Sequence, residues 1–178
     1  MKQKIAIFLT IVVVILGVFA IWYTTPKHYS RTINGVYYQL GTEGVIENIQ
    51  VHIDGKLKKH LNGKRTFRGV VDFEGSKVPR IPKDREKLQL IYNGHNFTTI
   101  FSGFRVIDDK GRIASDMLTY GLAYVDDKFS EFTINVMGDD NQWNPTNGYR
   151  ITAPAKNRQE AMKMSQELID TFNEQSWK

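Results

Sequence analysis

Residues 45–73 read VIENIQVHIDGKLKKHLNGKRTFRGVVDF, and this stretch decides the fold through the regular spacing of its apolar side chains. The alternating apolar residues are Ile49, Val51, Ile53, Phe67, Val71 and Phe73. A period of two is typical of a β-strand that buries one face and exposes the other. We therefore expect neighbouring antiparallel strands that contribute one face to a hydrophobic core.

Two dipeptides divide this stretch into three short strands. They are Asp-Gly at 54–55 and Asn-Gly at 62–63, and both favour hairpin turns. A two-residue loop after Ile53 would place Leu57 on the wrong face, because side chains alternate along a strand. We therefore predict a three-residue loop with a bulge, in which the first glycine is left-handed. The alternative is a short helical turn over residues 56–61.

Positive charge is concentrated between residues 56 and 68, where no acidic residue occurs. We call six residues of this segment the basic ribbon: Lys56, Lys58, His60, Lys64, Arg65 and Arg68. In the predicted register four of them share the outward face, and Lys64 and Arg65 lie at the turn beside them. The expected ligands are anionic envelope polymers or lipid headgroups, bound by a salt-sensitive attraction. The alternative is a solvated strand edge, where lysine blocks aggregation.

A second decisive stretch, residues 5–23, is apolar and contains no charged residue. At about 1.5 Å of rise per residue, such a helix spans a hydrocarbon core of about 30 Å. Lysines occur in residues 1–4, and this end of the chain is therefore expected to stay in the cytoplasm. Trp22 and Tyr23 are aromatic residues of the kind found at the membrane–water interface, here on the outer side. The sequence predicts a single-pass protein of the cell membrane, with its folded domain outside.

The alternative is a signal peptide cleaved after Ala20, since Val18-Phe19-Ala20 matches a cleavage site. Cleavage would leave a secreted protein. In both cases residues 24–31 are expected to form a linker and residues 32–178 one extracytoplasmic domain. Nucleic acid is not an expected partner for an exported domain.

The composition fits one ordinary folded domain. The chain has 178 residues, of which 41% are hydrophobic, and its formal net charge is +5. It contains no cysteine, which excludes disulfides, thiol catalysis and a lipid-modified cysteine. Exported domains without disulfides are common in Gram-positive bacteria, so we expect a cell-envelope protein of that kind.

The rest of the chain shows strand patterns and then a helix. The expected strands are residues 32–40 (with a turn at 34–35), 88–92, 97–107, 112–118, 121–125, 129–137 and 149–152, and residues 76–87 form an exposed connection. A helix is expected over about residues 157–173, because Asn157 and Glu160 have capping-box spacing before apolar residues of helical period. The predicted fold is mainly β: an antiparallel sandwich or meander with one C-terminal amphipathic helix.

Catalytic and metal-binding patterns are weak. The four histidines form no His-x-His or His-x-x-x-His pair, so we expect no metal site and no cofactor. Asp-Asp pairs at 108–109, 126–127 and 139–140 each stand at an expected turn, where aspartate accepts hydrogen bonds from the backbone. The alternative is an envelope hydrolase that uses these loop carboxylates.

Trp143 lies in a polar loop before the last expected strand. One interpretation is a ring folded back on the sheet as a lid, and the other is an aromatic platform for a sugar or a peptide. Trp143 and the basic ribbon are the candidate binding residues. The favoured function is therefore a non-catalytic binding or assembly module. A small-ligand binder, with a cavity between sheet and helix, is a further alternative.

Overall fold

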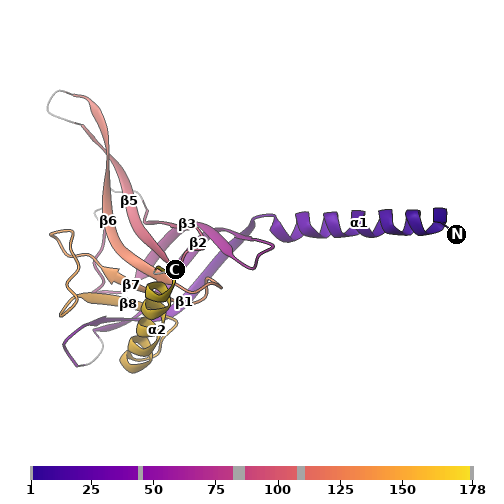
Figure 1. The fold of residues 1–178 in the computed structure, drawn as a ribbon. Helices are drawn as coiled ribbons and strands as arrows, with labels where there is room; N and C mark the ends of the chain where they lie inside the picture. The colour runs from indigo at the N-terminus through magenta and orange to yellow at the C-terminus, as the bar shows by residue number, and fades with distance from the viewer. Residues whose placement is uncertain (1, 44–45, 82–86, 108–110, 177–178) are drawn as a thin grey trace.

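The computed structural model describes residues 2–43, 46–81, 87–107 and 111–176. The helices are α1 (Lys2–Thr24) and α2 (Arg158–Ser176). The strands are β1 (Lys27–Gln39), β2 (Glu47–Lys59), β3 (Arg65–Glu74), β4 (Gln89–Tyr92), β5 (Phe97–Ile107), β6 (Ile113–Val125), β7 (Phe132–Val136) and β8 (Tyr149–Ala153). α1 projects as a separate rod from the strand domain, whereas α2 lies against it (Figure 1).

The strands form a closed antiparallel barrel in which each strand pairs with its neighbours in the sequence. Closure depends on β1, because its first part pairs with β2 and its end pairs with β8, where Val36 lies opposite Thr152. The expected antiparallel β architecture and the meander order are confirmed; the sandwich is not, because the strands form one closed barrel. A single meander closes on itself because closure satisfies the backbone groups of both edge strands.

Inward side chains fill the barrel, as expected for eight strands. Phe67, Tyr92 and Phe129 stack at one end, and the ring centroids of Phe67 and Phe129 lie 4.6 Å apart. Burial, together with the nearby aspartates of the β6–β7 turn, raises the pKa of Tyr92 to about 12. An apolar void of about 10 Å³ remains beside Ile53, Val71 and Ile134, which is too small for a ligand. This part of the barrel is a packed core.

β2 is continuous, so the predicted loop and bulge at residues 54–55 are wrong, and so is the alternative helical turn. Ile53 and Leu57 already share a face in an unbroken strand, because they are an even number of residues apart. Gly55 lies directly opposite Gly69, and the ring of Phe67 covers both glycines. The second predicted turn, at residues 62–63, is confirmed: the hairpin turns at residues 60–64, where Gly63 has a φ of 82°.

Strand formation also extends further than expected elsewhere in the chain. β1 begins at Lys27, so most of the expected linker over residues 24–31 is strand. The turn expected at residues 34–35 lies inside β1, where Gly35 allows close approach to Thr152 of β8. The two strands expected at 112–118 and 121–125 are one strand, β6.

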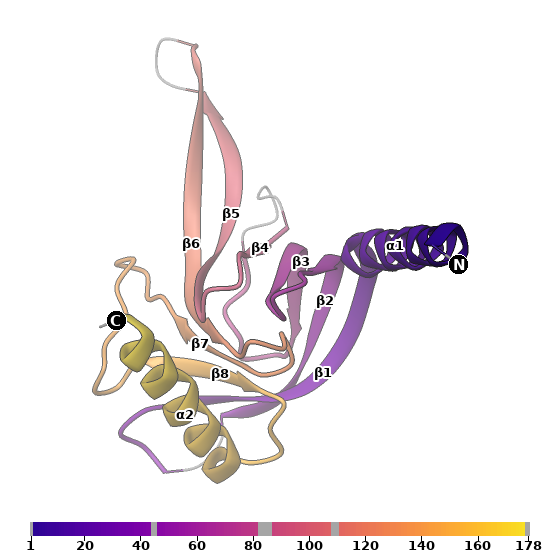
Figure 2. The same cartoon turned by 45° about the vertical axis from the view of Figure 1, so that its right-hand side comes forward.

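α2 crosses the outside of the barrel over β1, β6, β7 and β8 (Figure 2). Asn157 Oδ1 accepts a hydrogen bond from Glu160 N, and Glu160 Oε2 accepts one from Lys156 N, both at 2.9 Å. Ala161, Ser165 and Leu168 are buried against the barrel. β7 is consequently buried on both faces. The expected C-terminal amphipathic helix is confirmed.

The paired glycines of β2 and β3 yield a test of the register. A Cβ atom at Gly55 would meet the carbonyl oxygen of Arg68 and the Cα of Gly69, which are backbone atoms that cannot rotate away. We expect Gly55→Ala to lower the free energy of unfolding by about 1–3 kcal/mol. Urea unfolding of the full chain in detergent measures this loss.

Gly138→Ala is the matched control, because the nearest atom to its Cβ is a side-chain oxygen of Asp140 at 3.0 Å. No backbone atom lies closer than 3.4 Å to that Cβ, so the loss of stability should be smaller for Gly138→Ala. Equal stability of Gly55→Ala and the original chain would contradict the continuous β2.

Candidate functional site: the basic hairpin beside the N-terminal helix

The β2–β3 hairpin lies next to the end of α1, and the chain connectivity places it there. Only Thr25 and Pro26 separate α1 from β1, and the first residue of β1, Lys27, pairs with Leu57 near the end of β2. The turn after β2 therefore points toward the end of α1 (Figure 1). Among the described residues, α1 is the one helix long and apolar enough to span a membrane.

Two lysines contact the aromatic rings at the end of α1. Lys27 Nζ lies 3.7 Å from the ring centroid of Trp22, and Lys59 Nζ lies 5.9 Å from that of Tyr23. Ammonium groups over aromatic faces are attracted by the ring quadrupole. These contacts join the helix end to both β1 and β2.

The outward face of the hairpin carries three residues of the basic ribbon. Lys56 lies directly opposite Arg68, and Lys58 follows on the same face opposite Thr66. Like charges directly opposite each other destabilise a sheet. No ion pair found in the described part of the chain involves these three side chains. An anionic group above the hairpin would relieve their repulsion.

The other three residues of the basic ribbon lie around the turn. His60 Nε2 is 3.1 Å from Thr66 Oγ1, and Lys64 N donates to Asn62 Oδ1 at 3.1 Å. Arg65 belongs to the opposite face and donates to the carbonyl of Lys128 at the barrel rim. The structure thus gathers Lys56, Lys58 and Arg68 on one face, with His60 and Lys64 at the tip.

Leu61 at the hairpin tip is a site residue that sequence reasoning missed. It lies beyond the end of β2 and is 72% exposed. Leu61 is therefore an exposed apolar side chain next to the basic ribbon, because the turn begins at residue 60.

Trp143 lies at the opposite end of the barrel from the basic ribbon, in the connection between β7 and β8. Its Nε1 donates to the carbonyl of Tyr149 at 3.2 Å, and the ring packs against Gly148. The guanidinium of Arg150 lies 4.8 Å from the ring centroid. The ring is therefore folded back on the barrel, although it also borders an open hollow of about 530 Å³.

Arg150 joins this loop to α2 and β7. Its Nε donates to Asn135 Oδ1 at 2.8 Å, and its Nη1 donates to Ser165 Oγ at 3.1 Å. Asn135 and Ser165 are both buried. The stacked Trp143 and the bridging Arg150 therefore form a structural unit at this end of the barrel.

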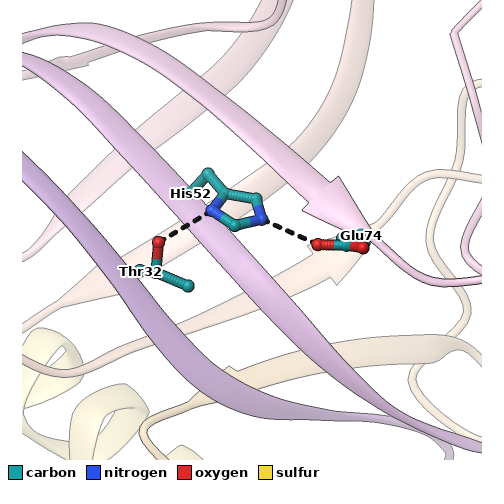
Figure 3. A network of polar contacts seen from close by, with 3 residues as sticks. All are labelled: Thr32, His52 and Glu74. Atoms are coloured by element: carbon teal, nitrogen blue, oxygen red, sulfur yellow. Dashed lines mark hydrogen bonds and ion pairs between the residues drawn. The ribbon is translucent and has the colours of Figure 1, made fainter.

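Thr32, His52 and Glu74 form a chain of hydroxyl, imidazole and carboxylate groups (Figure 3). Thr32 Oγ1 lies 2.8 Å from His52 Nδ1, and His52 Nε2 lies 3.1 Å from Glu74 Oε2. The three residues come from adjacent strands, so the cross-strand register places them together. Such an order of groups resembles an activated nucleophile. All three lie on the open outer face, where water reaches them, and cross-strand polar pairing accounts for their positions.

Asp126 and Asp140 accept hydrogen bonds in turns, as predicted. Asp126 Oδ1 accepts hydrogen bonds from Ser130 N and Glu131 N, and Asp140 Oδ1 accepts one from Gln142 N. The 126–127 and 139–140 pairs lie at opposite ends of β7, and residues 108–109 lie outside the described residues. Within the described ranges, no group of three His, Asp or Glu side chains is arranged to hold a metal ion.

Comparisons with protein-family models, with curated proteins and with solved structures find no match to this chain.

The role of Arg150 is tested by Arg150→Met, which keeps much of the side-chain volume but removes the donors. We expect a loss of about 1–3 kcal/mol in the free energy of unfolding, because the buried Asn135 oxygen is left without its partner. Arg158→Met is the matched control, since Arg158 Nε has no hydrogen-bond partner in the described chain. Equal losses in the two variants, measured by urea unfolding, would contradict the bridging role.

Proposed function

We propose that this protein is a single-pass membrane module whose barrel lies outside the membrane and whose basic hairpin binds anionic phosphate headgroups of the same membrane. α1 is the anchor, and the lysines in its first turn favour a cytoplasmic N-terminus. The barrel is then a binding or assembly module rather than an enzyme. The alternative of cleavage after Ala20 would release the same barrel, still carrying Trp22 and Tyr23.

The short connection between α1 and β1 is the observation that carries the proposal. Thr25 and Pro26 together span at most about 10 Å, even when fully extended. The negative potential of an anionic membrane acts over about one Debye length, which is about 8 Å at physiological ionic strength. The start of β1 and the paired end of β2 are thus held at the range where this potential acts.

The surface of the hairpin suits such a position. The cations Lys56, Lys58 and Arg68 share a face, and Leu61 at the tip is exposed among further cations. A cationic surface with an apolar tip combines electrostatic attraction with insertion at the headgroup boundary. The opposed like charges of Lys56 and Arg68 further favour an anion at this surface.

The proposal is tested by binding of the barrel, residues 25–178, to vesicles of phosphatidylglycerol and phosphatidylcholine. Each basic side chain near an anionic surface contributes about 1 kcal/mol, so Lys56→Gln with Lys58→Gln and Arg68→Gln should weaken partitioning about 100-fold. The control changes three exposed lysines elsewhere, Lys77, Lys156 and Lys163, to glutamine with the same loss of net charge.

Both triple variants should unfold thermally in one cooperative transition like the parent barrel, which verifies that they are folded. Equal partitioning of the two variants would show that net charge, and not the hairpin, drives binding. Binding of soluble polyglycerol phosphate without binding of vesicles would contradict the lipid headgroups as ligand and would favour an envelope polymer.

A further inference from the structure

A long two-stranded arm extends from the barrel beyond the other strands (Figures 1 and 2). It consists of residues 103–107 of β5 and residues 113–117 of β6, which pair with each other and end with Ile107 opposite Ile113. β4 pairs with β5 only at Ile100 and Phe101, and the β7 ladder on β6 begins at Gly121. Within the described chain, the arm therefore has two open strand edges.

The arm carries a large share of the exposed apolar surface. Outside α1, seven large hydrophobic side chains are exposed among the described residues, and four of them lie on the arm: Val106, Ile107, Ile113 and Met117. Ile107 is 73% exposed and Ile113 is 70% exposed. Charged side chains, proline or a bulge normally protect an open edge; the arm's described residues contain no lysine or proline, and their charged side chains are Arg105 and Asp116. The bulge in β5 lies between Ile100 and Phe101, in the barrel.

We propose that the arm pairs with the arm of a second copy of this chain, with β6 antiparallel to β6 about a two-fold axis at Ala114. This register extends the pairing one residue beyond β6, to Arg112, which lies opposite the second copy's Asp116, as Asp116 lies opposite the second copy's Arg112. The two ion pairs are reciprocal, as an isologous two-fold interface requires. Ala114, which lies between them on the same face, is small enough for its symmetric copy to lie opposite it.

The direction of the arm fits this partner. It points sideways from the direction of α1 rather than along it (Figure 1). If α1 spans the membrane, as the proposed function states, all copies hold their arms at one height above the same membrane. The charge-complementary register itself does not depend on that anchoring.

Cross-linking through a single cysteine tests the register directly, because the chain has no cysteine of its own. Directly opposed antiparallel residues have Cα atoms about 4.5 or 5.5 Å apart, and both distances allow a disulfide. Full-length Ala114→Cys in native membranes should therefore form a covalent dimer on mild oxidation. Asn144→Cys, exposed in the β7–β8 connection, is the control and should remain monomeric.

Charge reversal in the Ala114→Cys background tests the proposed ion pairs. Arg112→Asp alone, or Asp116→Arg alone, places like charges opposite each other and should reduce dimer formation about tenfold. The double change, Arg112→Asp with Asp116→Arg, restores opposite charges and should restore the dimer. An unchanged thermal midpoint of the barrel verifies that each variant is folded.

Either of two outcomes would overturn the proposal: no cross-linking of Ala114→Cys above the Asn144→Cys control, or cross-linking that neither single reversal reduces. Protection of Ala114→Cys from a water-soluble maleimide without a dimer would indicate that lipid or another protein covers the arm. Repeating the reaction in neutral detergent separates this proposal from headgroup binding, since the dimer should persist there without anionic lipid.

Discussion

β1 is the strand on which the rest of the structure depends, because it pairs with both β2 and β8. Residues 27–37 pair with β2, and the strand begins just after α1. Its end pairs with β8 and closes the barrel, where Gly35 allows the two backbones to approach closely. One strand therefore both completes the core and places the basic hairpin beside the N-terminal helix.

The alternating pattern of residues 49–53 predicted the core face correctly, and Ile49, Val51 and Ile53 are all buried. The turn predicted at residues 54–55 was wrong, because Asp-Gly is a strong local turn signal, whereas the turn predicted at residues 62–63 was right. Gly55 serves another purpose: it lets β2 lie against Gly69 of β3 beneath the ring of Phe67. That need arises from a partner strand distant in sequence, so local propensity could not reveal it.

The candidate site was predictable only in part for the same reason. The shared face of Lys56, Lys58 and Arg68 follows from the period of two within neighbouring strands. The position of the hairpin beside α1 depends on the register between Lys27 and Leu57, which the sequence pattern does not contain. The contact chain of Thr32, His52 and Glu74 likewise spans three strands and required the assembled sheet.

The arm shows how a closed barrel can still offer an open edge. Closure satisfies the backbone groups within the barrel, but β5 and β6 continue past their other neighbours. The proposed function and the proposed dimer would place two tasks, contact with the membrane and contact with a second copy, on different parts of one sheet. A rigid core between them fixes their relative positions.

The position of the hairpin tip at the membrane surface is the central claim, and a spin label on Asn62→Cys measures it directly. In full-length protein reconstituted in phosphatidylglycerol vesicles, collision rates with oxygen and with a water-soluble nickel chelate report the depth of the label. We expect the label at Asn62 to lie at headgroup depth, and a label on Asn144→Cys, at the far end of the barrel, to lie in bulk water. Equal exposure of both labels to the nickel chelate would contradict the proposed contact.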